Sequence, residues 1–299
     1  MTPFVATIGT FDGVHRGHQA VVARARHMAD SFGISVAGVT FDPHPKVVVA
    51  PDRAPKLLTL VPEKVEALAA AGCDEVWVLE FNRALASLSP EEFLHSHLMT
   101  RGELRGLVVG HDFAMGRDRV GSVDHLRRLG EKLGFPVEQV AVLADAAGPI
   151  SSSRIRTALT EGNLDEVTQS LGRPYRLRGR VMKGRGEGTK LGFPTANLEV
   201  DPLQMLPRHG VYAVRVTGDD LQGEYLGALN IGIRPTYELD TVSIEVHLLD
   251  FSADLRGQGL ILEFEAFLRP EQKFNGVQEL ADQIKRDTHQ VRKALEEPK

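Results

Sequence analysis

The sequence lacks the features of several protein classes. It has one cysteine, Cys73, among 299 residues, so no internal disulfide can form, and a reducing compartment is expected. No run approaches the ~20 apolar residues that a membrane-spanning helix needs. The N-terminal MTPFVATIGTFDG also lacks the basic start and apolar core of a signal peptide. The sequence therefore predicts a soluble, cytoplasmic protein.

An excess of basic residues is also missing. Lys and Arg number 35 against 40 Asp and Glu, a formal net charge of −5, which excludes broad non-specific binding to nucleic acid. Hydrophobic residues make up 42% and charged residues 25%, so disordered, collagen-like and disulfide-scaffold classes are excluded. At ~100 to 200 residues per domain, the length predicts two domains.

The first half of the chain alternates short apolar runs with helical patterns. Strands are expected at residues 4–8, 35–40, 75–79, 106–109 and 137–142, and helices at 19–31, 62–71, 90–100 and 123–133. This alternation predicts a parallel sheet with crossover helices, a Rossmann-like α/β domain. A helical pair is expected over residues 151–171, with Gly162 and Gly172 as stop signals.

After Gly172 the pattern becomes rich in β-strands. The expected strands are residues 177–182, 210–216, 224–231, 241–249 and 259–267, and no helical crossover separates them. A small closed or Greek-key barrel is therefore predicted. Asn275 is expected to cap a final helix. The apolar face of that helix would carry Val277, Leu280, Ile284, Val291 and Leu295. The predicted domains are residues 1–171 and 172–299.

The segment GTFDGVHRGH, residues 9–18, lies between the first expected strand and helix. Its glycines allow close backbone approach, and a helix N-terminus offers N–H groups and a positive dipole end to a phosphate. His15 and His18 are three residues apart and can face the same anion. The glycines follow neither the GxGxxG nor the Walker pattern. A turn with two surface histidines is the structural alternative, but the place after the first strand favours phosphate chemistry.

Two later segments support a phosphate site. Ser152 and Ser153 stand at an expected helix start with Arg156 close behind, and Asp112 follows another strand. Each alone indicates an ordinary cap or turn. In this order, these motifs resemble the bifunctional prokaryotic riboflavin kinase and FAD synthetase family. HRGH and ISSSRIR (residues 150–156) match its nucleotidylyltransferase signatures, with Ser153 in place of Thr, and FDPHP (residues 41–45) also matches.

The second half is similar to the riboflavin kinase module of that family. The matching motifs are LGFPTANL (191–198), NIGIRPT (230–236), EVHLLDF (245–251), LRPEQKF (268–274) and QIKRD (283–287). Residues 173–190 hold seven basic residues and one acid, and GEGTKLG lacks the GK[ST] of a Walker loop, so a non-Walker kinase is expected. Thr189 stands where the family usually has Arg, which leaves Lys190 or Arg185 for that phosphate contact.

The resemblance implies a fold, two reactions and a set of site residues. Riboflavin and ATP would give FMN, and FMN with a second ATP would give FAD and pyrophosphate. Glu245, His15 and His18 would be catalytic, and Thr195 and Asn197 would hold Mg²⁺. Flavin contacts would be Phe41, His44, Asp112, Asn230 and Arg269. ATP and phosphate contacts would be Gly9, Phe11, Asp12, Gly13, His15, His18, Asp112, Ser152, Ser153, Arg156, Lys183, Gly188, Lys190 and Gly192.

The expected partners are therefore riboflavin, FMN, FAD and ATP, with no nucleic acid and no membrane. The sequence leaves open whether the chain forms a homo-oligomer. One alternative function is another nucleotidylyltransferase with a non-catalytic flavin-binding barrel, which LGFPTAN and Glu245 disfavour. A second alternative is a non-catalytic flavin-binding or regulatory protein, which the paired histidines and the two phosphate segments disfavour.

Overall fold

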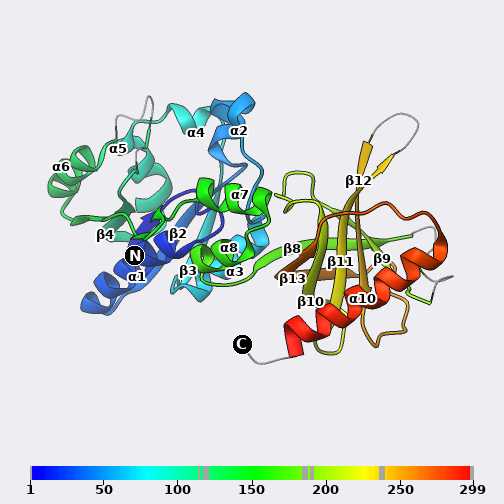
Figure 1. Ribbon diagram of the computed structural model, residues 1–299. Helices are drawn as coiled ribbons and strands as arrows, with labels where there is room; N and C mark the ends of the chain where they lie inside the picture. The colour runs from blue at the N-terminus through cyan, green and yellow to red at the C-terminus, as the bar shows by residue number, and fades with distance from the viewer. Residues whose placement is uncertain are drawn as a thin grey trace. The chain divides into compact units, whose positions relative to one another are not determined.

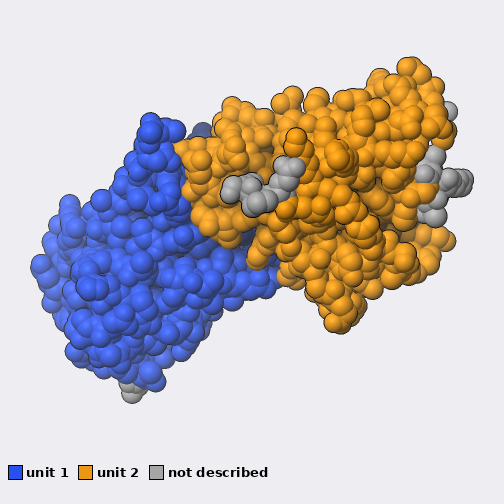
Figure 2. Space-filling view, turned by 60° about the horizontal axis from the view of Figure 1, so that its bottom comes forward, with its two compact units in different colours: residues 1–152 blue, residues 153–299 orange. Residues whose placement is uncertain are grey.

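The computed structural model describes residues 2–113, 115–116, 121–183, 188, 192–235 and 240–296. The chain divides into two compact units, residues 1–152 and 153–299, coloured blue and orange in Figure 2. The predicted phosphate contact Lys190 and its alternative Arg185 lie outside the described residues. Within the described ranges, no helix is both long and apolar enough to cross a membrane.

Unit 1 is built on a five-stranded parallel sheet in the order β3-β2-β1-β4-β5. Its strands are β1 (Pro3–Ile8), β2 (Ser35–Asp42), β3 (Glu75–Glu80), β4 (Glu103–Gly110) and β5 (Val137–Val140). The chain builds outward from β1 to β3 and then returns to the other side of β1 for β4 and β5 (Figure 1). The carboxyl ends of β1 and β4 thus form a topological switch point, where sheets of this kind bind ligands.

The helices of unit 1 cover both faces of this sheet. They are α1 (Arg16–Phe32), α2 (Pro45–Val49), α3 (Val61–Ala70), α4 (Arg83–Ser87), α5 (Pro90–Phe93) and α6 (Val123–Leu133), with a 3₁₀ turn η1 (Pro51–Arg53) and a π-helix η2 (Leu94–Met99). The helix predicted over residues 90–100 is therefore an α-helical turn continued by a π-helix. A two-stranded hairpin, β6 (Ala144–Asp145) and β7 (Gly148–Pro149), follows β5.

The side chains of β1 alternate between two cores. Val5 packs with Val22 and Ala25 of α1, whereas Ala6 packs in a separate cluster with Leu126 of α6. All five side chains are completely buried, and each fully buried Val or Leu contributes about 1.5 to 3 kcal/mol. Because helices bury both faces, the predicted doubly wound α/β domain is confirmed.

Unit 2 is a closed barrel with the strand order β10-β11-β12-β9-β8-β13. Its strands are β8 (Tyr175–Met182), β9 (Ala196–Val200), β10 (Gly210–Gly218), β11 (Tyr225–Pro235), β12 (Asp240–Leu248) and β13 (Gly259–Arg269), and every neighbouring pair is antiparallel. The helical pair α7 (Ser152–Glu161) and α8 (Leu164–Leu171) precedes the barrel. The predicted barrel is confirmed, although β9 was not expected as a strand.

The final helix, α10 (Val277–Glu296), packs on the outside of the barrel (Figure 1). Val291 is completely buried there with Ala213 and Leu249. The predicted apolar face is wrong at its start, because Val277 is 68% exposed. The predicted cap is also wrong by one residue. The first helical carbonyl acceptor is Gly276, and the backbone N–H of Asn275 donates to the Glu279 carboxylate instead.

Candidate active sites

The loop after β1 has a strained backbone held by buried contacts. Phe11 and Val14 adopt φ values of 47° and 42°, in the left-handed region that non-glycine residues rarely occupy. The N–H of Gly9 donates to the carbonyl of Val39 at 3.0 Å, and the buried Phe11 ring lies edge-on to His18 at 5.3 Å. Strain of this kind gathers at functional sites. We call residues 9–15 with the first turn of α1 the sheet-edge site.

His15 and His18 face each other across the start of α1. His15 caps the helix, and its Nδ1 accepts the backbone N–H of His18 at 3.4 Å. The two rings stack with centroids 3.7 Å apart. A Cβ at Gly17 would lie 3.0 Å from Cε1 of His15, so glycine is needed there for the ring to take this position.

The charge of His18 is set by its surroundings. The residue is partly buried, but its Nδ1 atom is fully shielded and has no hydrogen-bond partner among the described residues. This burial holds the pKa of His18 well below its ordinary value of 6.5, and the positive charges of His15 and Lys64 act in the same direction. His18 is therefore a neutral imidazole at pH 7, able to donate an N–H to a phosphate oxygen.

Asp12 fixes the loop rather than pointing into solvent. Its side chain is 1% exposed, and Oδ1 accepts the N–H groups of Leu58 at 2.8 Å and Thr59 at 3.3 Å. The Thr59 hydroxyl in turn accepts the N–H of Gly13 at 3.0 Å. The predicted phosphate contacts Asp12 and Gly13 are thus anchored to the segment that leads into α3.

Lys64, on α3, was not predicted from the sequence. It is 3% exposed, and burial lowers its pKa while the carboxylates of Asp12 and Asp42 act in the opposite direction. Its only sequence signal is helical spacing, four residues before the buried Leu68. The lysine adds a positive charge near His18 at the carboxyl edge of the sheet.

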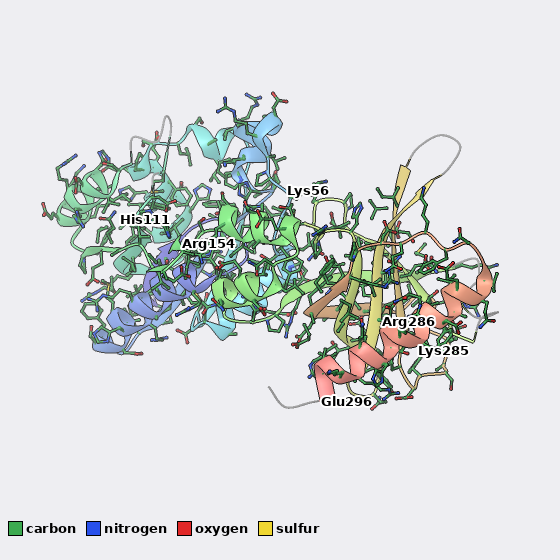
Figure 3. The ribbon with its side chains drawn as sticks, viewed as in Figure 1. Lys56, His111, Arg154, Lys285, Arg286 and Glu296 are labelled. Atoms are coloured by element: carbon green, nitrogen blue, oxygen red, sulfur yellow. The ribbon has the colours of Figure 1, made fainter. Side chains whose placement is uncertain are left out.

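The ISSSRIR motif spans the division between the units. The Ser152 hydroxyl donates to the backbone carbonyl of Asp12 at 2.9 Å, so Ser152 lies at the sheet-edge site. In unit 2, Arg154 (labelled in Figure 3) forms a 2.7 Å ion pair with Glu166 of α8. Ser153 is exposed and Arg156 is half-buried on α7. Arg154 is thus bound within the helical pair, and Arg156 stays a predicted phosphate contact.

The predicted flavin contacts of unit 1 lie at the end of β2 and just after β2 and β4, on the same edge of the sheet. The Phe41 ring packs against Phe81 with centroids 5.4 Å apart, and His44 caps α2 by accepting the N–H of Lys46 at 3.2 Å. Asp112 is 83% exposed, with Oδ1 3.9 Å from Nδ1 of His111. The parallel strands bring these segments to the edge that carries His15 and His18.

In unit 2, three predicted residues form one row across neighbouring strands. Glu245 of β12 pairs with Asn197 of β9 on one side and with Asn230 of β11 on the other. Paired residues project from the same face, so the three side chains lie together. The Thr195 hydroxyl donates to Oε2 of Glu245 at 3.2 Å, and the Ser243 hydroxyl donates to Oε1 at 2.9 Å. We call Thr195, Asn197, Asn230 and Glu245 the barrel site.

The predicted phosphate contacts of unit 2 flank the barrel site. A Cβ at Gly188 would clash with the carbonyl oxygen of Phe193 and would lie 3.2 Å from the Thr195 hydroxyl, so only glycine fits. Gly192 has a φ of 81°, which also favours glycine. Lys183 is exposed and directly follows Met182, the partner of Asn197 in β8.

Arg269 extends the row of the barrel site by two strands. It pairs with Val211 of β10, and Val211 pairs with Asn230. Among the described residues, no three His, Cys, Asp or Glu side chains gather as a metal site. The hydroxyl, amide and carboxylate oxygens of Thr195, Asn197 and Glu245 are nevertheless the donor types that Mg²⁺ takes.

Together these features define a class of protein. An α/β unit with paired histidines at its switch point is followed in the chain by a closed β-barrel with a row of oxygen-bearing side chains. The FAD synthetase family model matches residues 1–154, and the riboflavin kinase family model matches residues 171–295.

The bifunctional riboflavin kinase/FMN adenylyltransferase of Listeria monocytogenes is 39% identical, over 96% of this chain and 91% of its own. The enzyme of the same name from Pseudomonas fluorescens is 40% identical, over 96% and 92%. A crystal structure titled macrolide-efflux protein from Streptococcus pneumoniae shares 30% identity and a TM-score of 0.88, covering 97% of this chain and 94% of that one.

The chain belongs to the family of bifunctional riboflavin kinases/FMN adenylyltransferases. The predicted family, fold class and pair of activities are confirmed, and ATP is the co-substrate that both activities imply. The alternative of a non-catalytic barrel is disfavoured by the riboflavin kinase match. The predicted boundary at residue 172 stays a prediction.

Proposed function

We propose that the two reactions use two separate sites, one at the edge of the parallel sheet and one on the barrel. Riboflavin is phosphorylated at the barrel site, and FMN is adenylylated at the sheet-edge site. The observation that carries the first assignment is the 3.2 Å hydrogen bond from Thr195 to Glu245, within a row that also holds Asn197 and Asn230. The stacked histidines at a helix start support the second.

At the barrel site, Glu245 accepts the proton of the riboflavin 5′-hydroxyl. That hydroxyl is neutral and a poor nucleophile, so a base within hydrogen-bond reach is needed. The oxygen then forms a bond to the γ-phosphorus of ATP while the bond to the β-phosphate oxygen breaks, giving FMN and ADP. Asn230 and Arg269 contact the flavin. The phosphates of ATP are held by Lys183, Gly188, Lys190 and Gly192.

Thr195 and Asn197 would hold Mg²⁺ at the barrel site. Their oxygens are neutral, and Mg²⁺ commonly combines a few protein oxygens with water and substrate phosphates. When bound, the ion supplies positive charge that offsets the charge developing on the transferred phosphoryl group. The Thr195 hydroxyl keeps a lone pair for the metal while its proton is donated to Glu245.

At the sheet-edge site, the FMN phosphate attacks the α-phosphorus of a second ATP, and pyrophosphate leaves. This nucleophile is already ionised near neutral pH, so no general base is required. His15, His18 and the N–H groups at the start of α1 donate to the oxygens where charge develops. Ser152, Ser153 and Arg156 hold the leaving pyrophosphate. Asp12 keeps the loop of Gly9, Phe11 and Gly13 in shape, and Phe41, His44 and Asp112 contact the flavin.

We also propose that the enzyme works in the cytoplasm. Its partners are riboflavin, FMN, FAD and ATP, with no nucleic acid or membrane among them. The net charge of −5 and the single buried cysteine support this assignment.

The metal assignment is tested with two matched variants. Thr195→Val and Ser243→Ala each remove one hydroxyl that donates to Glu245, but only Thr195 is proposed to bind Mg²⁺. Chromatography of the products from riboflavin and ATP, over a series of Mg²⁺ concentrations, should give a half-maximal Mg²⁺ requirement raised ~10-fold in Thr195→Val. The requirement should be unchanged in Ser243→Ala. Equal Mg²⁺ dependence in both variants would contradict the role of Thr195.

A further inference from the structure

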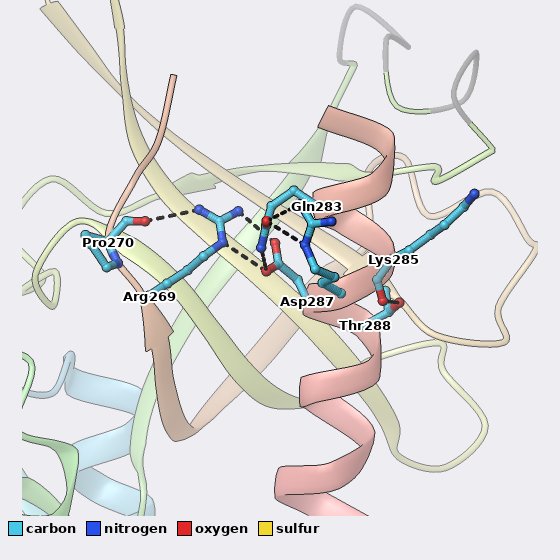
Figure 4. Close-up of polar contacts among 7 residues, drawn as sticks. Arg269, Pro270, Gln283, Lys285, Asp287 and Thr288 are labelled. Carbon is cyan, nitrogen blue, oxygen red and sulfur yellow. Dashed lines mark hydrogen bonds and ion pairs between the residues drawn. The ribbon is translucent and has the colours of Figure 1, made fainter. Parts of the chain in front are cut away.

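The guanidinium of Arg269 forms an ion pair with the carboxylate of Asp287, on the C-terminal helix α10. Nε of Arg269 donates to Oδ1 of Asp287 at 2.9 Å and Nη2 donates to Oδ2 at 2.7 Å (Figure 4). Gln283, one turn earlier on α10, donates to the same Oδ1 at 2.8 Å. The Asp287 side chain is 4% exposed and that of Arg269 is 14% exposed. This is a bidentate, largely buried pair, which fixes the plane of the guanidinium.

This pair lies beside the barrel site. Arg269 is in the strand row that continues through Val211 to Asn230. The chain after Arg269 also reaches that strand, because Oε2 of Glu271 accepts the N–H of Ile233 at 3.3 Å. A Cβ at Gly232 would clash with Oε1 of Glu271 and would lie 3.1 Å from the Asn230 amide nitrogen. The segment from Arg269 to Glu271 therefore borders the residue proposed to contact the flavin.

Arg269 keeps donors that the fold does not use. Of its five N–H groups, two bind Asp287 and one on Nη1 donates to the carbonyl of Pro270 at 3.1 Å. Among the described residues this leaves one N–H on each terminal nitrogen. The flavin of riboflavin and FMN carries ring carbonyl oxygens, and FMN adds a phosphate, all of which accept such donors.

A buried ion pair adds little net free energy to the packing of a helix, because the desolvation of both charges offsets their attraction. Apolar contacts already attach α10 to the barrel, through Val291 and Leu295 against Ala213 and Leu249. The ion pair between Asp287 and Arg269 therefore contributes more to the orientation of the guanidinium than to the attachment of α10 to the barrel.

We propose that Asp287 is a positioning residue of the riboflavin kinase site, which holds Arg269 so that its two remaining N–H groups meet oxygen acceptors of the flavin. The inference rests on the proposed flavin contact of Arg269. Gln283 supports it by fixing the carboxylate. The helix α10 thereby becomes part of the flavin site without itself touching the substrate.

The test compares Asp287→Asn with Asp250→Asn in the full-length enzyme. Both variants remove a carboxylate that pairs α10 with the barrel, because Asp250 binds Arg292 of the same helix at 2.6 Å. Asp250 has a φ of 57°, which Asn tolerates well. Asp287→Asn should raise the KM for riboflavin ~10-fold or more with kcat within ~3-fold, as expected for lost ground-state binding. Asp250→Asn should change neither. Circular dichroism and Tm report that the barrel of each variant is folded.

Two further variants separate the possible outcomes. If Asp287 acts through Arg269, Arg269→Lys should raise the KM for riboflavin, and the double variant should show no further rise.

Should Asp287→Asn fold poorly, Gln283→Met is a milder change, because it removes only one of the three hydrogen bonds to the Asp287 carboxylate. This variant should still raise the KM for riboflavin ~2- to 5-fold. A normal KM in Asp287→Asn or Gln283→Met, with a raised KM in Arg269→Lys, would overturn the positioning role. A normal KM in Arg269→Lys would instead refute its flavin contact and the inference with it. Because riboflavin and FMN share the flavin ring, the inhibition constant for the product FMN should rise in Asp287→Asn by about the same factor as the KM for riboflavin.

Discussion

The imidazole rings of His15 and His18 are stacked 3.7 Å apart with their planes 20° from parallel. Two rings at this distance cannot both carry a positive charge without strong repulsion. Burial already lowers the pKa of His18, and His15 and Lys64 lower it further. In the proposed reaction, His18 therefore acts as a neutral N–H donor at pH 7.

The first prediction follows from that role. His18→Ala should slow the conversion of FMN to FAD by ~10²-fold or more, comparable with the loss of one preorganised donor in other enzymes. Formation of FMN from riboflavin should stay near the wild-type rate, because it uses the barrel site. Separate assays starting from FMN and from riboflavin measure the two rates. An equal loss of both would indicate misfolding and would remove the support for a histidine role.

A milder change tests the geometry of the histidine pair. In Gly17→Ala the new Cβ would lie 3.0 Å from Cε1 and 3.1 Å from Nδ1 of His15, so the ring must shift by a few tenths of an ångström. We expect a ~10- to 100-fold loss of adenylylation with little change in Tm, because small misplacements in a preorganised site are costly for the rate. Gly33→Ala cannot serve as the control variant, because Gly33 has a φ of 66°, a backbone conformation that alanine rarely adopts. Ala20→Gly, in the same helix, serves better, and its adenylylation rate should be nearly normal.

The low pKa of His18 also predicts a pH dependence of stability. Below its ordinary pKa of 6.5 the unfolded chain binds a proton that folded His18 does not, so folding stability falls as the pH falls from 6.5 toward the folded pKa. One such proton contributes a slope of at most about 1.4 kcal/mol per pH unit. His18→Gln cannot titrate. The difference in Tm between wild type and His18→Gln should therefore change between pH 7.5 and 5.5, in the direction that favours the variant at low pH. A constant difference would contradict a depressed pKa.

Much of the fold was predictable because local pattern and tertiary structure agree. The first four strands of the parallel sheet contain short apolar runs, β5 begins one that continues beyond it, and each lies near its predicted position. Strand β9 was not predicted because its sequence, ANLEV, has polar residues and buries only Leu198, so it shows no apolar run. The helices α2 and α4 were missed because five residues are too few to show helical periodicity.

The candidate sites were predicted unevenly for a related reason. Residues in motifs, such as Thr195 and Glu245, could be identified from the family resemblance. Lys64 lies in none of the quoted motifs, and the QIKRD motif alone gave no role to Asp287. A charged residue within a helix normally faces solvent, and only tertiary packing shows that both are buried. Their burial depends on partners far away in sequence, Asp12 for Lys64 and Arg269 for Asp287.

Two fragments test the domain boundary. The helical pair packs within unit 2, where the N–H of Arg208 donates to the carbonyl of Leu159 at 2.9 Å. Residues 153–299 should therefore fold and convert riboflavin to FMN but not to FAD. Residues 172–299 should retain kinase activity with a lower Tm, because they lack Leu159. A soluble, folded 153–299 fragment without kinase activity would show that the barrel site depends on unit 1.

The central claim, that phosphorylation and adenylylation use separate sites, is tested most directly by Glu245→Gln. This variant keeps the shape of the side chain and removes its basicity, and it should lower FMN formation by ~10²- to 10⁴-fold, the range of general-base catalysis. Because the FMN phosphate attacks as an anion, the same protein should convert supplied FMN to FAD at nearly the wild-type rate. Both rates can be measured by chromatography on one preparation. Normal phosphorylation of riboflavin by Glu245→Gln, or a parallel loss of FAD formation from FMN, would contradict the account.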